Sequence, residues 1–202
     1  MAKVIVPVGF DGGPLWDGEP ESGTTAPTEF EIATPTSVVS LSLDEYKVWL
    51  LSFADPEMAN RCQFDRVHLE RLADLEFASD GQAVVESLSK QGLLAEFDPE
   101  GPSGVEFLKR YRLFPNGDAM GNTGDERHYY RIGREGRVLV KVMWAVYVMW
   151  QSSVYYPSLW DALTEYHQTL DEPLLELDQM AQLLAASVPG IVTNRCGFVQ
   201  AT

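Results

Sequence analysis

The first half of the chain contains three stretches in which apolar residues recur at helical spacing. The first stretch begins at Ser42, which stands three residues before Glu45. That spacing is typical of a capping box, in which the hydroxyl and the carboxylate each accept a hydrogen bond from a free amide at the helix start. The apolar residues that follow share one helical face: Tyr46, Trp49, Leu50 and Phe53. Pro56 is expected to end this helix.

Two further helices follow the same pattern. Asp65 can cap the second helix, and Ser79 or Asp80 can cap the third, which we predict over residues 79–91. The apolar stripes are Leu69, Leu72 and Ala73 in the second helix and Val84, Val85 and Leu88 in the third. Gly92 stands directly behind the third helix, where a residue in the left-handed conformation commonly closes a helix.

A β-hairpin is predicted after the third helix. Residues 93–97 have the composition of a strand, residues 98–102 that of a turn, and residues 105–114 that of a returning strand. Three helices that continue through Leu88-Ser89-Lys90-Gln91-Gly92-Leu93-Leu94 into such a hairpin resemble the helix-to-wing junction of the winged helix-turn-helix superfamily, over about a third of the chain. The resemblance implies a winged-helix fold, with the third helix and the wing as the usual contact surfaces.

An extended arm is predicted in front of this region, over residues 1–39. Val4, Val6 and Val8 alternate with other residues as in a strand. Phe10 and Trp16 flank the turn-forming sequence Asp-Gly-Gly-Pro, and a disordered tail would seldom contain such large apolar residues. We expect the arm to be anchored by Phe10 and Trp16, either on its own domain or on a partner.

The fold class predicted from these elements is α+β, with a winged-helix core that includes a second hairpin over residues 40–142. This hairpin pairs residues 128–132 with 137–142, and a mainly helical extension follows over residues 143–202. Residues 143–150 favour a helix, with a strand as the alternative, and their aromatic side chains are more typical of a core than of a ligand surface. Ser158 can cap the next helix, and the last helix is placed with Pro173 in its first turn, followed by Leu174 in its apolar stripe.

The charge of the chain weakens the case for DNA. The formal net charge is −15, and the third predicted helix has Lys90 as its only base, against Asp80 and Glu86. Duplex DNA is bound largely through Lys and Arg that neutralise phosphates. Only Gln82 and Gln91 in this helix could pair with a base edge through two hydrogen bonds.

Residues 105–141 form a locally basic region with eight bases and five acids. Basic and aromatic side chains on a sheet can contact phosphates and stack bases, but they can equally pair with the abundant acids of this chain. We therefore select a set of candidate partner-binding residues from this region and the arm. They are Phe10 and Trp16 in the arm, Lys109, Arg110 and Arg112 on the predicted wing strand, and Arg127, Tyr129, Arg131 and Arg134 on or beside the second hairpin.

Catalytic and metal-binding motifs are absent from the sequence. Cys62 and Cys196 form no Cys-x-x-Cys pair, and His68, His128 and His167 have no ligand-like spacing to one another or to a cysteine. We therefore predict no catalytic residue, no metal and no cofactor. No signal peptide and no apolar run of membrane-spanning length is present, which predicts a cytoplasmic protein without a membrane partner.

The function predicted from the sequence is binding rather than catalysis. The favoured hypothesis is a non-catalytic intracellular winged-helix adaptor that docks a protein or peptide partner. The alternative is a DNA-binding transcriptional regulator that contacts DNA through its wing and basic hairpin, which the net charge disfavours. The sequence leaves the oligomeric state open.

Overall fold

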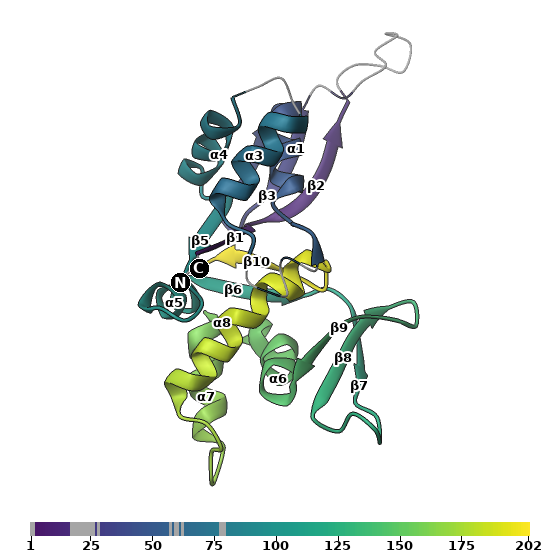
Figure 1. The fold of residues 1–202 in the computed structure, drawn as a ribbon, viewed down its shortest axis with the longest axis vertical. Helices are drawn as coiled ribbons and strands as arrows, with labels where there is room; N and C mark the ends of the chain where they lie inside the picture. The colour runs from purple at the N-terminus through teal and green to yellow at the C-terminus, as the bar shows by residue number, and fades with distance from the viewer. Residues whose placement is uncertain are drawn as a thin grey trace.

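The computed structural model describes residues 3–16, 27, 29–56, 58, 61, 63–76 and 80–202, which form an α+β fold. At one end (top in Figure 1), three helices lie beside a three-stranded antiparallel sheet of order β2-β3-β4. These helices are α1 (Leu43–Leu51), α3 (Arg66–Glu76) and α4 (Gly81–Lys90), and the strands are β2 (Phe10–Leu15), β3 (Glu29–Ala33) and β4 (Val38–Leu41).

The other end contains four helices and a second antiparallel sheet, of order β7-β8-β9 (Figure 1). The helices are α5 (Pro102–Arg110), α6 (Trp144–Ser152), α7 (Leu159–Gln168) and α8 (Leu177–Thr193), and the strands are β7 (Asp118–Gly121), β8 (Tyr129–Arg134) and β9 (Arg137–Met143). The predicted second hairpin is therefore confirmed, and residues 144–152 are a helix, as favoured from the sequence.

Four strands lie between the two ends. β1 (Val4–Pro7) pairs with β5 (Leu94–Phe97), and β10 (Gly197–Ala201) pairs with β6 (Tyr111–Pro115), both antiparallel. Val8 and Val199 join the two pairs through a parallel bridge, and the Gly9 amide donates to the Val199 carbonyl at 2.8 Å. Segments from opposite ends of the sequence therefore lie side by side in the middle of the fold (Figure 1).

β1 separates two hydrophobic clusters. Ile5 belongs to the cluster that contains Trp49 and Leu88, whereas Val4 and Val6 belong to the larger cluster around α6, α7 and α8. This division follows from strand geometry, since successive side chains point to opposite faces. A segment predicted as an arm thus supplies buried residues to both cores.

The local signals at the starts of α1 and α4 and directly behind α4 are confirmed. Ser42 and Glu45 form the predicted capping box of α1, and the Asp80 carboxylate accepts from the Ala83 amide at the start of α4. Gly92 has a φ of 73°, the left-handed conformation expected of it. Leu69, Ala73, Val85 and Leu88 are buried, and Leu72 and Val84 are partly buried against the same cluster.

The predicted returning strand over residues 105–114 is wrong in its first part, because residues 102–110 form helix α5. Pro102 occupies the helix start, where its missing amide costs nothing. Gly104, Phe107 and Leu108 are buried at helical spacing, and this period outweighs their strand-like composition. β5 pairs with β1 and not with the predicted returning strand, so the predicted wing hairpin is not formed.

The predicted start of the last helix is also wrong. α8 begins at Leu177, with Glu176 and Gln179 forming its capping box, so Pro173 lies outside it. A capping box satisfies two free amides at once and thereby determines where the helix starts. Leu174 is left in the connection after α7, with its side chain 99% exposed.

Replacement of Leu88 by Ala tests the core around α4. Leu88 is fully buried beside Trp49 and Leu69, so we expect the free energy of unfolding to fall by about 2–5 kcal/mol, measured by urea denaturation. Val67→Ala on α3 is the control, because Val67 is 68% exposed and should change stability by less than ~0.5 kcal/mol. Equal effects of the two substitutions would contradict the packing described for α4.

Candidate functional site

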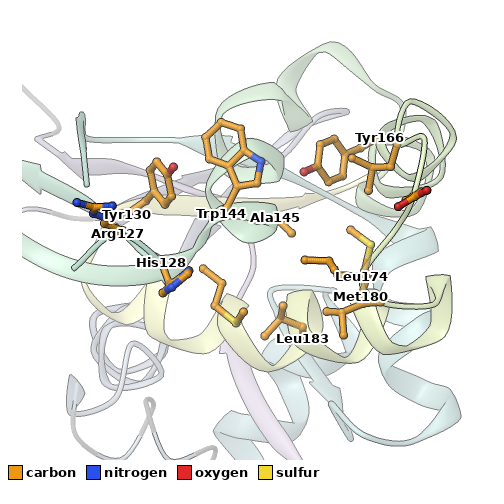
Figure 2. A pocket seen from close by; sticks show the side chains of 13 residues that line it. Arg127, His128, Tyr130, Trp144, Ala145, Tyr166, Leu174, Met180 and Leu183 are labelled. Atoms are coloured by element: carbon orange, nitrogen blue, oxygen red, sulfur yellow. The ribbon is translucent and has the colours of Figure 1, made fainter. Parts of the chain in front are cut away.

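A cavity of about 600 Å³ opens between β8, the start of α6 and the α7–α8 region. We call it the Trp144 cleft, and its lining includes Tyr130, Met143, Trp144, Tyr166, Leu174 and Leu183. Figure 2 shows Tyr130, Trp144 and Tyr166 along one side, with Met180 and Leu183 across the space from them. This volume lies within the range of about 300–1,000 Å³ that is typical of ligand sites, which are likewise mostly apolar.

One wall of the cleft is built where β9 passes directly into α6. Met143 ends β9 and is also the residue that caps α6, so Trp144 begins the helix at the edge of the sheet. The Trp144 ring lies 4.8 Å from the ring of Tyr130, measured between ring centres, and the Tyr130 ring lies 5.0 Å from that of Tyr147. Tyr147 is buried, whereas Met143 and Trp144 remain 43% and 48% exposed. This part of the lining is therefore anchored in the core by Tyr147 and presents Met143 and Trp144 at its exposed edge.

The rest of the lining comes from α7, α8 and the connection between them. Tyr166 lies in α7, Met180 and Leu183 lie in α8, and Leu174 and Leu175 lie in the connection. An almost fully exposed leucine and a half-exposed tryptophan in one cavity are unusual, because each forgoes a burial energy of about 25 cal/mol per Å² of apolar surface left in water. Apolar surface gathered in a concave site is typical of a place where another molecule binds.

Charged groups lie only at the margin of the Trp144 cleft. Arg127 and His128 enter the lining from the segment before β8, and Glu172 enters it from the α7–α8 connection. The Arg127 Nε donates to the Gly124 carbonyl at 3.2 Å, which fixes this guanidinium against its own loop. The interior of the cleft is otherwise suited to apolar groups.

Of the predicted site residues, Arg127 lines the cleft and Tyr129 lies close to it. Tyr129 is half-exposed at the start of β8, where it pairs with Met143 of β9. Arg131 donates to the carbonyls of Met120, Gly121 and Asn122, and Arg134 donates to those of Asn116 and Arg195. These two guanidinium groups therefore hold turns of their own domain together.

The three predicted bases of the wing strand lie on other elements. Lys109 and Arg110 are in α5, where the Lys109 Nζ pairs with the Glu106 carboxylate at 3.0 Å and lies 5.4 Å from the Trp160 ring centre. Arg112 is in β6, and its Nε donates to the Pro157 carbonyl at 3.4 Å. The structure does not bring these bases into the Trp144 cleft.

Phe10 and Trp16 lie away from the cleft, on β2 and just behind it. Both are exposed, although the Phe10 ring packs on Phe198 at 4.9 Å between ring centres. Phe10 and Arg134 share a smaller cavity of about 120 Å³ with Asp11. Near this cavity the Tyr46 hydroxyl donates to the Asp11 carboxylate at 3.0 Å, and burial together with this hydrogen bond raises the pKa of Tyr46 to about 12.

The sequence did not identify Met143, Trp144 and Leu174 as site residues, for two different reasons. Met143 and Trp144 belong to an aromatic block that we assigned to the core, and Tyr147 and Trp150 of that block are indeed buried. Met143 and Trp144 are exposed where α6 follows the edge strand β9. The position of a strand at the edge of a sheet cannot be read from the local sequence. For Leu174 a signal was present, since the Glu176 and Gln179 capping box excludes it from α8.

Other chemistry has little support in the described residues. Burial raises the pKa of the Cys196 thiol to about 11, so this sulfur is a poor nucleophile at neutral pH. No group of three or more His, Cys, Asp or Glu that could hold a metal ion occurs in the described ranges. None of the helices in the described part of the chain has the length and apolar character needed to cross a membrane.

Comparison of the chain with protein-family models, with curated proteins and with solved structures found no significant match.

Proposed function

We propose that this chain is a cytoplasmic, non-catalytic binding protein that takes an apolar segment of a protein partner into the Trp144 cleft. The observation that carries the proposal is the convergence of three exposed apolar side chains, Met143, Trp144 and Leu174, on one cavity of about 600 Å³. Tryptophan is prominent among the residues that dominate the energetics of protein interfaces.

The energy available from these side chains suits a specific but reversible interaction. Full burial of a large apolar side chain stabilises by about 1.5–3 kcal/mol. Met143, Trp144 and Leu174 each contribute less than this maximum if a partner covers only part of their surface. Lost translational and rotational freedom costs about 4–15 kcal/mol, so contacts at the rim are needed as well. A micromolar dissociation constant, equivalent to about 8 kcal/mol, therefore requires rim contacts beyond these three side chains.

The alternative of a DNA-binding regulator has less support. The segment predicted as the returning wing strand is mainly helix α5, and Arg131 and Arg134 donate to backbone carbonyls of their own domain. Lys109 pairs with Glu106, and the net charge of −15 opposes attraction to phosphates at long range. A protein partner accords better with bases that are already engaged within the fold.

Selection from a displayed random peptide library tests the proposal. Peptides that bind the full chain are expected to bind a Trp144→Ala variant at least ~10-fold more weakly, because loss of a central aromatic contact costs about 2 kcal/mol or more. Tyr155→Ala is the control, since Tyr155 is 84% exposed and does not line the cleft. Thermal unfolding of both variants checks that the fold is intact. If no selected peptide distinguishes Trp144→Ala from the wild type, the proposed function is wrong.

A further inference from the structure

We propose that the segment bound in the Trp144 cleft is an amphipathic helix whose apolar face fills the cleft and whose Lys and Arg residues face the α7–α8 connection. This inference rests on the proposed function and names the kind of partner. Two independent features of the cleft carry it: the nature of its lining and the distribution of charge around it.

The lining favours a helix over an extended peptide. An added strand needs unpaired backbone groups along a sheet edge, but β8, which contributes Tyr130, is the middle strand of its sheet. β9 contributes only its last residue, Met143, to the lining. A helix satisfies its backbone hydrogen bonds internally and can therefore place side chains in an apolar cleft without an added strand pairing.

The side chains of the lining also match a helical occupant. Met143 and Met180 both line the cleft, and methionine adapts its shape to side chains of different size. Trp144 and Leu183 extend this apolar surface. Grooves lined by such residues accept the apolar face of an amphipathic helix, with anchors three or four residues apart.

The charge of the α7–α8 wall indicates a basic partner. Residues 142–194 contain six acids and no Lys or Arg. Four of these acids lie in or next to the α7–α8 connection: Asp171, Glu172, Glu176 and Asp178. In the ion pairs of the described residues none of the four has a basic partner, and Glu172 lines the cleft itself.

The opposite margin has the reverse charge, because Arg127 lines the cleft there. A helix with its bases on one flank therefore has one favoured orientation in the cleft. Exposed charges of this kind contribute more to the association rate and to partner choice than to affinity.

Peptides selected from the random library and then synthesised provide the probe. Their sequences are expected to show apolar residues at helical spacing together with an excess of Lys and Arg, and circular dichroism should show a gain of helix on binding. The double substitution Asp171→Lys and Glu172→Lys should weaken binding of these peptides by about 2- to 30-fold, the effect of losing two exposed ion pairs. Raising the salt concentration should reduce this difference, since exposed charges are screened.

The matched control is the double substitution Asp44→Lys and Glu76→Lys. It changes the net charge by the same amount at two exposed positions on α1 and α3, at the other end of the molecule, and should weaken binding less than twofold. Equal weakening by both double variants would overturn the inference, because net charge and not the wall of the cleft would then attract the peptide.

The two proposals fail in different ways. Peptides that require Trp144 but lack bases, or that bind without gaining helix, overturn the helical basic partner and leave the proposed function intact. Peptides whose binding is unaffected by Trp144→Ala overturn the proposed function and this inference together.

Discussion

A chain that lacks residues 1–8 is expected not to fold stably. Val4, Ile5, Val6 and Val8 are 1–2% exposed, and β1 lies between the two hydrophobic clusters. Burial of four such side chains stabilises by roughly 6–12 kcal/mol, at about 1.5–3 kcal/mol each. The whole stability of a typical domain is about 5–15 kcal/mol, so their loss removes most or all of it. Circular dichroism and urea denaturation of the truncated chain measure the outcome.

Lys3→Ala provides the control for this deletion. The Lys3 side chain is exposed and forms a surface ion pair with Glu96 at 3.4 Å, so its removal should change stability by less than ~1 kcal/mol. A truncated chain with a cooperative transition near that of the wild type would show that β1 is not part of the core.

Replacement of Trp150 by Ala is expected to lower the free energy of unfolding by about 3–5 kcal/mol, measured by urea denaturation. Trp150 is 2% exposed in the larger cluster, and its Nε1 donates to the Cys196 carbonyl at 2.6 Å. The substitution leaves a cavity and removes one link between α6 and the turn before β10. The Cys196 carbonyl still accepts from the Asn116 amide at 2.9 Å, so the cavity is the main cost.

Trp16→Ala is the matched control, because it deletes the same side chain from a position that is 57% exposed. We expect this change to lower the free energy of unfolding by less than ~1 kcal/mol. If Trp150→Ala had no larger effect than Trp16→Ala, the assignment of α6 to the core would be wrong.

Short-range signals explain which parts of the fold could be predicted. The caps at Ser42 and Asp80 and the left-handed Gly92 depend on residues within one helical turn, and each is confirmed. The error at residues 105–110 came from composition, which favours a strand, although Gly104, Phe107 and Leu108 have the spacing of a helix. The strand that pairs with β5 could not be predicted from local signals, because it is β1, about 90 residues earlier in the chain.

The Trp144 cleft could not be predicted for a similar reason. Trp144 and Leu174 are 30 residues apart in the sequence and line the same cleft only because α7 and α8 pack against α6. Two of the bases predicted to bind a partner, Arg131 and Arg134, instead donate hydrogen bonds to backbone carbonyls that only the tertiary structure brings near them. Composition therefore does not show on which surface the exposed apolar residues gather.

The bridge between Val8 and Val199, which joins the β1–β5 pair to the β10–β6 pair, also constrains how the chain folds during synthesis. β10 comprises residues 197–201, so a ribosome must release these residues before Val8 can meet Val199. Contacts between residues so distant in sequence raise the contact order, which slows folding. Until then, β1 can pair only with β5. Apolar side chains of the growing chain remain partly exposed, and such surface favours aggregation or binding by chaperones.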